Sequence, residues 1–267
     1  MKRIALMLVF ALSAMGQQLN NMEKSLTCED GSRRWSSDNR ERFCEMREYP
    51  LAAVQRLSVD AKQNGGVSVK GWNRSDVLVR AKVDTWAETS ADARLLAGYV
   101  QVRTAGGNVY AEQTQEIGKS GSAVTYEIFV PHRTGLSLKA HNGGLNITDV
   151  IGQVEFEAQN GGVNLARLGG MVKGKTTNGG LNVELAGSRW EGGELNVSTT
   201  NGGVNLLMPD NYSARLETST RNGRVKIDYP VTLTGDITRD IAVNIGSGGP
   251  LVKVTTVNGG VNVRRKS

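Results

Sequence analysis

The chain has 267 residues, which is long enough for one large β domain or two small ones. Its 33 glycines against 5 prolines and 5% aromatic residues predict many tight turns, because glycine costs backbone entropy where no turn requires it. The formal net charge of +6 is mild, and basic residues cluster only in the tail at 264–266, so we expect no nucleic-acid partner.

Residues 1–16 have the pattern of a secretory signal peptide. Lys2 and Arg3 precede an apolar run at 4–12, and small residues stand before the cleavage site that we place after Gly16. The run is shorter than the ~20 residues that a membrane-spanning helix needs, and no later segment is long and apolar enough. We expect an exported protein in the periplasm, in the cell envelope or outside the cell, with no transmembrane span in the mature chain.

The only two cysteines lie in an N-terminal segment at residues 17–50. Export places them in an oxidising compartment, where we expect Cys28 and Cys44 to form one disulfide. A lipidated Cys28 would need a small preceding residue and an apolar run upstream, and Thr27 and the polar stretch at 17–24 provide neither. The further role of this segment stays open.

Residues 51–131 are expected to form a first β region that contains one short helix. At 88–98 the apolar residues shift to a helical spacing that includes Leu95 and Leu96, with Gly98 near the C-terminal end. We expect an element of this first β region to cap the first coil of the repeats and to cover its open strand edge. Alternating apolar and polar residues predict strands at 57–59, 67–69, 77–79 and 124–130.

An Asn-Gly-Gly motif divides residues 132–267 into repeats. The motif recurs after 18 residues twice in succession, then after 23 residues and, as Asn-Gly-Arg, after 21. Apolar residues alternate with polar ones on both sides of the motif, which predicts one strand entering and one strand leaving each turn. A repeat of 18 residues is too short for a helical crossover. The motif starts at Asn64, Asn142, Asn160, Asn178, Asn201 and Asn258, with the variant at Asn222.

Two arrangements of these strand pairs agree with the pattern. Asn followed by Gly favours positive φ and a hairpin, which would give an antiparallel meander. Rows of equivalent side chains favour a stack in which each repeat is one coil and neighbouring strands lie roughly 4.8 Å apart. In that stack, alternating charge at Lys139, Glu157 and Lys175 stabilises neighbouring strands. A row of hydrogen-bonded amides would form from Asn146, Asn164, Asn182 and Asn205.

The stacked arrangement is our prediction. The chain should be an all-β protein with a single-stranded parallel β-solenoid, or β-roll, whose coils contain roughly 18–21 residues. Equivalent aliphatic residues would fill its core, and no coil could bury its apolar face alone.

A combined pattern runs from about Leu51 to the C-terminus. It consists of the Asn-Gly-Gly segment at 64–72, the strand at 76–81, the helix-like insert, the step at Val130-Pro131 and the repeated Asn-Gly turns. On these features the chain resembles the bacterial putative-adhesin family, a domain-of-unknown-function family of β-strand-repeat proteins. The resemblance implies a secreted or envelope-associated β-solenoid, and it brings no catalytic residues.

No residues stand at the spacings that catalysis or metal binding requires. The two histidines, His132 and His141, have no Cys, Asp or Glu at a metal-ligand spacing. The acidic residue that follows the glycines in calcium-binding nonapeptide rolls is absent. We therefore expect no cofactor, no metal and no enzymatic activity. The nearest enzymatic alternative, a polysaccharide-processing β-helix, would depend on the charged group Glu155, Glu157, Lys173 and Lys175.

The leading interpretation is an exported, non-enzymatic protein with a structural or adhesive role in the envelope or at the surface. Its partner would be an envelope or surface component, either a protein or a glycan. The alternative is an envelope glycan-binding module. Its ligand contact would lie in the repeat expansion at 187–191, where Trp190 could stack on a sugar beside Arg189.

Overall fold

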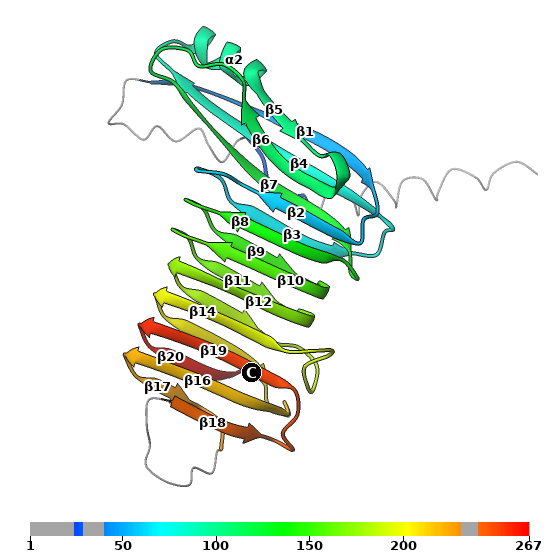
Figure 1. Cartoon of the computed structure of the whole chain (residues 1–267), viewed down its shortest axis with the longest axis vertical. Coiled ribbons are helices and arrows are strands. Elements are labelled where there is room, and N and C mark those ends of the chain that lie inside the picture. Colours follow the sequence, from blue (N-terminus) through cyan, green and yellow to red (C-terminus); the bar gives the residue numbers. More distant parts are fainter. Residues whose placement is uncertain (1–23, 29–39, 231–239, 267) are drawn as a thin grey trace, which may run out of the picture.

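The computed structural model describes residues 24–28, 40–230 and 240–266. The predicted signal peptide lies outside the described residues. The chain forms an elongated structure in which strands are stacked along the long axis (Figure 1). The all-β prediction is confirmed.

Sheet A contains ten strands within the described ranges. In spatial order they are β1 (Glu41–Ala52), β4 (Asp76–Ala87), β7 (Gly121–Pro131), β3 (Val67–Trp72), β9 (Leu145–Thr148), β11 (Val163–Ala166), β13 (Leu181–Glu184), β15 (Val204–Pro209), β20 (Val261–Lys266) and β17 (Val225–Ile227).

Sheet B also contains ten strands, counted over the same part of the chain. In spatial order they are β18 (Asp240–Ile245), β16 (Ala214–Asn222), β19 (Leu251–Asn258), β14 (Leu195–Asn201), β12 (Gly169–Asn178), β10 (Ile151–Ala158), β8 (Gly135–Ala140), β2 (Arg56–Asp60), β6 (Asn108–Gln113) and β5 (Val100–Arg103). A short 3₁₀ turn, η2 (Ala105–Gly107), precedes β6.

Each Asn-Gly turn joins one strand of sheet B to one strand of sheet A, and we call such a strand pair a coil. Equivalent residues of neighbouring coils lie opposite each other in parallel pairing. In sheet B, Val154 lies between Leu136 and Val172. The same register continues from the coil β8–β9 to the coil β14–β15.

Inward-facing aliphatic side chains fill the narrow space between the two sheets. Removing each of them from water contributes roughly 1.5–3 kcal/mol. Every coil needs its neighbours, because its own strands leave their long edges open. The central members are at most 3% exposed and are Leu145, Ile147, Val163, Leu165, Leu181, Val183, Val204 and Leu206.

Close approach of stacked turns explains the first glycine of each motif. The positive φ that the hairpin alternative needs is absent, because the motif glycines keep φ outside the left-handed region. A Cβ at Gly143 would instead overlap the carbonyl oxygen of Gly65, and a Cβ at Gly161 would overlap that of Gly143. The turns therefore lie directly on one another, as a stack of coils requires and a meander of hairpins does not.

The two sheets are mixed, so a single parallel roll does not describe the whole chain. β1 pairs antiparallel with β4, β4 with β7, β5 with β6, and β16 with β18. These strands lie toward the two ends of the stack (Figure 1). The physical reason is that a terminal coil has one unpaired edge, and strands that fold back onto it satisfy its backbone groups.

The spatial order of the coils departs from the sequence order near the C-terminus. β19 lies between β14 and β16, and β20 lies between β15 and β17. Stacking of the Asn222 coil directly on the Asn201 coil, as the repeat spacing suggests, is therefore wrong, because Asn258 lies between them. The last strand, β20, therefore lies within the stack and not at its end (Figure 1).

The short helical insert is present as α2 (Ser90–Tyr99). The N-cap Thr89 accepts a hydrogen bond from the backbone N–H of Asp92 at 3.1 Å. The helix packs against β4 and β1, where the hydroxyl of Thr85 donates to the carbonyl of Ala93 at 2.6 Å. The edges of the first coil are covered by strands of the first β region, since β6 pairs with β2 and β7 pairs with β3.

Candidate functional site

A ladder of asparagine side chains follows the edge where the Asn-Gly turns stack, and we call it the turn ladder. Each Nδ2 donates to the Oδ1 of a neighbour, with N···O distances of 2.7 to 3.2 Å. The structure brings together all the motif asparagines, including the variant at Asn222. In spatial order the members are Asn64, Asn142, Asn160, Asn178, Asn201, Asn258 and Asn222.

A second row, the strand ladder, lies on the outer face of sheet A. Its Nδ2···Oδ1 distances are also 2.7 to 3.2 Å. The last member, Asn262, stands in the same apolar-Asn-apolar pattern as the four predicted members. The ladder contains Asn146, Asn164, Asn182, Asn205 and Asn262.

An interior ladder member uses only half of its hydrogen-bonding capacity. Its amide has two N–H groups and its oxygen has two lone pairs, and the ladder occupies one of each. One N–H and one lone pair therefore remain for a ligand, repeated at the roughly 4.8 Å spacing of neighbouring strands. Because the ladder already fixes these side chains, a ligand would lose little affinity to side-chain ordering.

A shallow depression of about 440 Å³ opens beside the strand ladder. Asn164, Asn182 and Asn205 contribute amides to its lining, and Ala166 and Leu207 contribute apolar groups. Amides beside small apolar groups suit a ligand that carries polar substituents on an apolar frame.

Buried threonines behind the turns form a third row that the sequence pattern alone does not single out. Each hydroxyl donates to a motif glycine carbonyl of an adjacent coil, at 2.8 or 2.9 Å. The signal available in the sequence is a small residue two positions before the motif asparagine. The members are Thr176, Thr199, Thr256 and Thr220.

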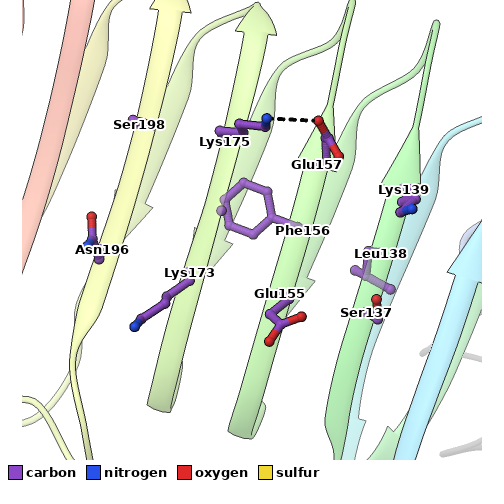
Figure 2. Close-up of a pocket in the computed structure, with 11 residues that line it drawn as sticks. Ser137, Leu138, Lys139, Glu155, Phe156, Glu157, Lys173, Lys175, Asn196 and Ser198 are labelled. Atoms are coloured by element: carbon purple, nitrogen blue, oxygen red, sulfur yellow. Dashed lines mark ion pairs between the residues drawn. The ribbon is translucent and has the colours of Figure 1, made fainter.

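Charged side chains alternate in sign across the outer face of sheet B (Figure 2). Glu157 lies between Lys139 and Lys175 in register, and it pairs with Lys175 at 3.1 Å between Nζ and Oε1. Glu155 pairs with Arg56 at 2.7 Å. The hydrogen bond from Arg56 lowers the pKa of Glu155 below its ordinary value. A general acid in glycoside cleavage needs a raised pKa, so this carboxylate is unsuited to that role.

A depression of about 430 Å³ lies over Gly174 on the same face. Gly174 presents no side chain between Lys173 and Lys175, and the ring of Phe156 lies beside this gap (Figure 2). A Cβ at Gly174 would overlap that ring, so the phenylalanine fills the space that a side chain would take. Lys173 pairs with Glu194 at 3.0 Å. Four of the charged residues that line the depression, Glu155, Glu157, Lys173 and Lys175, thus already have partners.

The predicted ligand contact at Trp190 is wrong. The indole is 3% exposed and belongs to the core, and its Nε1 donates to the carbonyl of Gly170 at 2.8 Å. The expansion of the repeat therefore directs its aromatic side chain inward, where burial is most favourable. Arg189 is exposed, but it has no aromatic platform beside it from Trp190.

The N-terminal segment is held on sheet A. The predicted disulfide joins Cys28 to Cys44 on β1. The Oε1 atom of Glu127 accepts hydrogen bonds from the backbone N–H and the hydroxyl of Ser25, at 2.8 and 2.7 Å. Arg80 forms a buried ion pair with the same carboxylate. Residues before the first strand thus cover a charge pair on β4 and β7.

Among the residues that the structure describes, no three His, Cys, Asp or Glu side chains gather into a potential metal site. The Nδ1 of His132 lies 2.7 Å from the Asp149 carbonyl, and its Nε2 lies 3.1 Å from Oδ1 of Asn73. His141 lines a shallow depression on sheet B. Over the described ranges, no helix combines the length and apolar character needed to cross a membrane.

These features define a class of all-β repeat protein whose surfaces carry amide and charge ladders. The model of the Toastrack DUF4097 family matches residues 48–264. The chain belongs to this family, and the predicted kinship with a putative-adhesin family of unknown function is confirmed. A comparison with curated proteins finds no match.

Several solved structures are similar to the chain. A putative cell adhesion protein from Clostridium sporogenes is 12% identical, over 85% of this chain and 100% of that chain, with a TM-score of 0.44. A putative adhesin from Parabacteroides distasonis is 10% identical over 83% and 97%, with a TM-score of 0.38. A putative adhesin from Bacteroides fragilis is 12% identical over 84% and 97%, with a TM-score of 0.30.

Proposed function

We propose that the protein is an exported, non-enzymatic β-repeat protein with a structural or adhesive role in the cell envelope or at the surface. The observation that carries the proposal is the strand ladder, a fixed row of amides on an exposed sheet face. A disulfide between Cys28 and Cys44 agrees with an oxidising compartment.

The in-register pairing from β8 to β15 supports the interpretation of this part as a short parallel β-solenoid. The repeat region is proposed to start at residue 132, directly after the first β region that ends at residue 131. The proposed division at residues 50 and 51 falls inside β1, which pairs with β4 along its whole length. The N-terminal segment therefore shares sheet A with the first β region.

An envelope glycan is the second candidate partner, beside a protein. Each hydroxyl of a sugar both donates and accepts, which matches the one N–H and one lone pair that every interior amide leaves free. A linear glycan along the long axis would meet an equivalent amide at each coil. The depression beside Ala166 and Leu207 would accept the apolar faces of the sugar rings.

An enzymatic role has less support. Glu155 and Glu157 each have a cationic partner, Arg56 and Lys175 respectively. Paired carboxylates of this kind stabilise neighbouring strands and leave no unpaired acid and base facing a common substrate.

Binding of the mature protein to glycan arrays and to isolated native envelope tests the proposal. The variant Asn164→Leu with Asn182→Leu removes two amides of the strand ladder while keeping a similar side-chain volume. The matched control, Asn160→Leu with Asn178→Leu, removes two amides of the turn ladder. We expect binding to fall in the first variant and to persist in the control. Circular dichroism checks that the wild type and the strand-ladder variant are both folded. If the two folded proteins bind equally well, the strand ladder is not the binding surface. Binding to an envelope protein with no signal on any glycan would remove the glycan candidate.

A further inference from the structure

Every member of the turn ladder is followed by glycine, which makes each of them open to deamidation. Glycine has no Cβ, so its backbone nitrogen can reach the preceding side chain with little obstruction. The nitrogen attacks Cγ of the asparagine, the bond from Cγ to Nδ2 breaks, and ammonia leaves as a five-membered succinimide forms. Water then opens the ring at one of its two carbonyls and gives aspartate or isoaspartate. The balance is one water consumed and one ammonia released.

Stacking opposes this reaction in the interior of the ladder. The side chain of Asn178 is held at both ends, since it donates to Asn160 and accepts from Asn201, each at 2.8 Å. The attacking nitrogen is engaged as well, because the N–H of Gly179 donates to the carbonyl of Asn201 at 3.1 Å. Ring closure therefore needs the side chain to leave the ladder and the turn to leave its neighbour, which is a local opening of the fold. The glycines after Asn201 and Asn258 donate in the same way, from Gly202 and Gly259.

The last member of the ladder lacks this protection. Asn222 donates to Asn258 at 2.7 Å, but within the described residues no further ladder member donates to its own Oδ1. Gly223 is exposed, whereas the first glycine of every other motif is buried or half-buried. Among the described strands, the one that follows, β17, is the edge of sheet A and pairs only with β20.

The opposite end of the ladder is covered. Gly65, which follows Asn64, is buried, and a Cβ there would overlap the carbonyl oxygen of Val124 on β7. The coil at Asn64 therefore has neighbours on both sides, through β6 and β7 on one and β8 and β9 on the other.

We propose that Asn222 is the deamidation site of the folded protein and that stacking protects the interior asparagines. A carboxylate at this position accepts hydrogen bonds but cannot donate to Oδ1 of Asn258, so the reaction removes the terminal ladder bond. Isoaspartate would also lengthen the backbone of the turn between β16 and β17. The modification thus acts at the last member of the turn ladder.

Peptide mapping by mass spectrometry tests this site in the oxidised full chain. The folded protein is held in mildly alkaline buffer, and conversion of each motif asparagine is followed with time, together with ammonia release. We expect Asn222 to convert about tenfold or more faster than Asn160, Asn178 and Asn201, since the rate follows the free energy of local opening. In concentrated urea the rates should become similar.

Two variants complete the test. Asn222→Gln should abolish the fast release of ammonia, because a longer side chain closes a less favourable ring, and Asn178→Gln should leave that release unchanged. An interior asparagine that converts as fast as Asn222 in the folded chain would overturn the proposal. Loss of the fast phase in the Asn178→Gln variant would overturn it as well.

Discussion

The coils from β8 to β15 and the coils at the C-terminus carry the same repeat pattern but differ in their order. In the first region each strand pairs with the equivalent strand of the next repeat in the sequence. In the second region the last repeat of the chain lies between two earlier ones. Both regions place asparagines, threonines and aliphatic residues in the same register. The repeat pattern therefore determines register, and it does not determine which coil becomes the neighbour.

The antiparallel strand β18 explains the order at the C-terminus. It occupies one edge of β16, so the strand that follows it pairs with the other edge. The connection turns at the start of β16, where the backbone N–H of Ser247 donates to the hydroxyl of Ser213 at 3.2 Å. Positive φ at Gly246, Gly248 and Gly249 gives this connection its sharp path.

A charge introduced into the core should give the largest loss of stability. The loss should be equal in the regular stack and in the C-terminal coils. Val183 in the regular stack and Val263 in the C-terminal coil both face the core and are at most 3% exposed. Val183→Asp and Val263→Asp should each lower the free energy of unfolding by more than about 3 kcal/mol, because the carboxylate has no partner in the core. Urea unfolding measures both. Arg264→Asp, on the exposed side of the same strand, should cost under ~0.5 kcal/mol. If Val263→Asp lowered the free energy of unfolding only slightly, the last coil would not lie inside the stack.

A side chain added where the turns stack should give the next largest loss of stability. A Cβ at Gly179 would overlap the carbonyl oxygen of Gly161, whereas a Cβ at Gly180 would lie 3.7 Å from the nearest atom, the carbonyl oxygen of Gly203. Gly179→Ala should therefore destabilise the protein by about 1–3 kcal/mol or more, and Gly180→Ala should change its stability far less. Thermal unfolding of the pair is the measurement. Similar losses would show that the turns are not closely stacked.

The threonine row should contribute equally in both regions. Thr199 and Thr256 each donate to a glycine carbonyl at 2.8 Å inside the stack. Replacement by valine keeps the shape and removes the donor, so each variant should lose about 1 kcal/mol of unfolding free energy. Thr255→Val, on the outer side of the same coil, is the control and should stay within ~0.5 kcal/mol. A loss of unfolding free energy in the Thr199 variant without one in the Thr256 variant would show that the two regions are not stabilised in the same way.

A small pH effect on stability should come from an ion pair between two coils of the regular stack. Asp149 accepts two hydrogen bonds from Arg167 of the next coil, at 2.6 and 2.8 Å. The Arg167 guanidinium lowers the pKa of Asp149 below its ordinary value of 3.8. Its contribution is therefore present above that value and is lost as the pH falls through the lower folded pKa. The pair is partly exposed, so the loss in Asp149→Asn should be under ~1 kcal/mol. Comparison of unfolding at neutral and acidic pH tests it, and an unchanged acid dependence in the variant would contradict this assignment.

Periodicity was enough to predict the strand pairs, their register and the strand ladder, and it placed the motif asparagines in turns without predicting that their amides bond in a row. It could not place the C-terminal coil, because the segments around Asn222 and Asn258 fit the same neighbours equally well. It also could not predict that Trp190 is buried, since an expansion of a repeat has no period to follow. The contact between Ser25 and Glu127 joins residues that are 102 positions apart, and no local pattern links them.

Disulfide trapping in the full chain tests the order of the coils most directly. Asn201 and Asn258 lie opposite each other on neighbouring strands, and Asn258 separates Asn201 from Asn222. Two neighbouring strands bring Cα atoms within the range of a disulfide, and two strands with a third between them, roughly 9.6 Å apart, do not. We expect Asn201→Cys with Asn258→Cys to form the new bond, and Asn201→Cys with Asn222→Cys to remain reduced. A bond between positions 201 and 222 in the folded protein would contradict the insertion of the last coil.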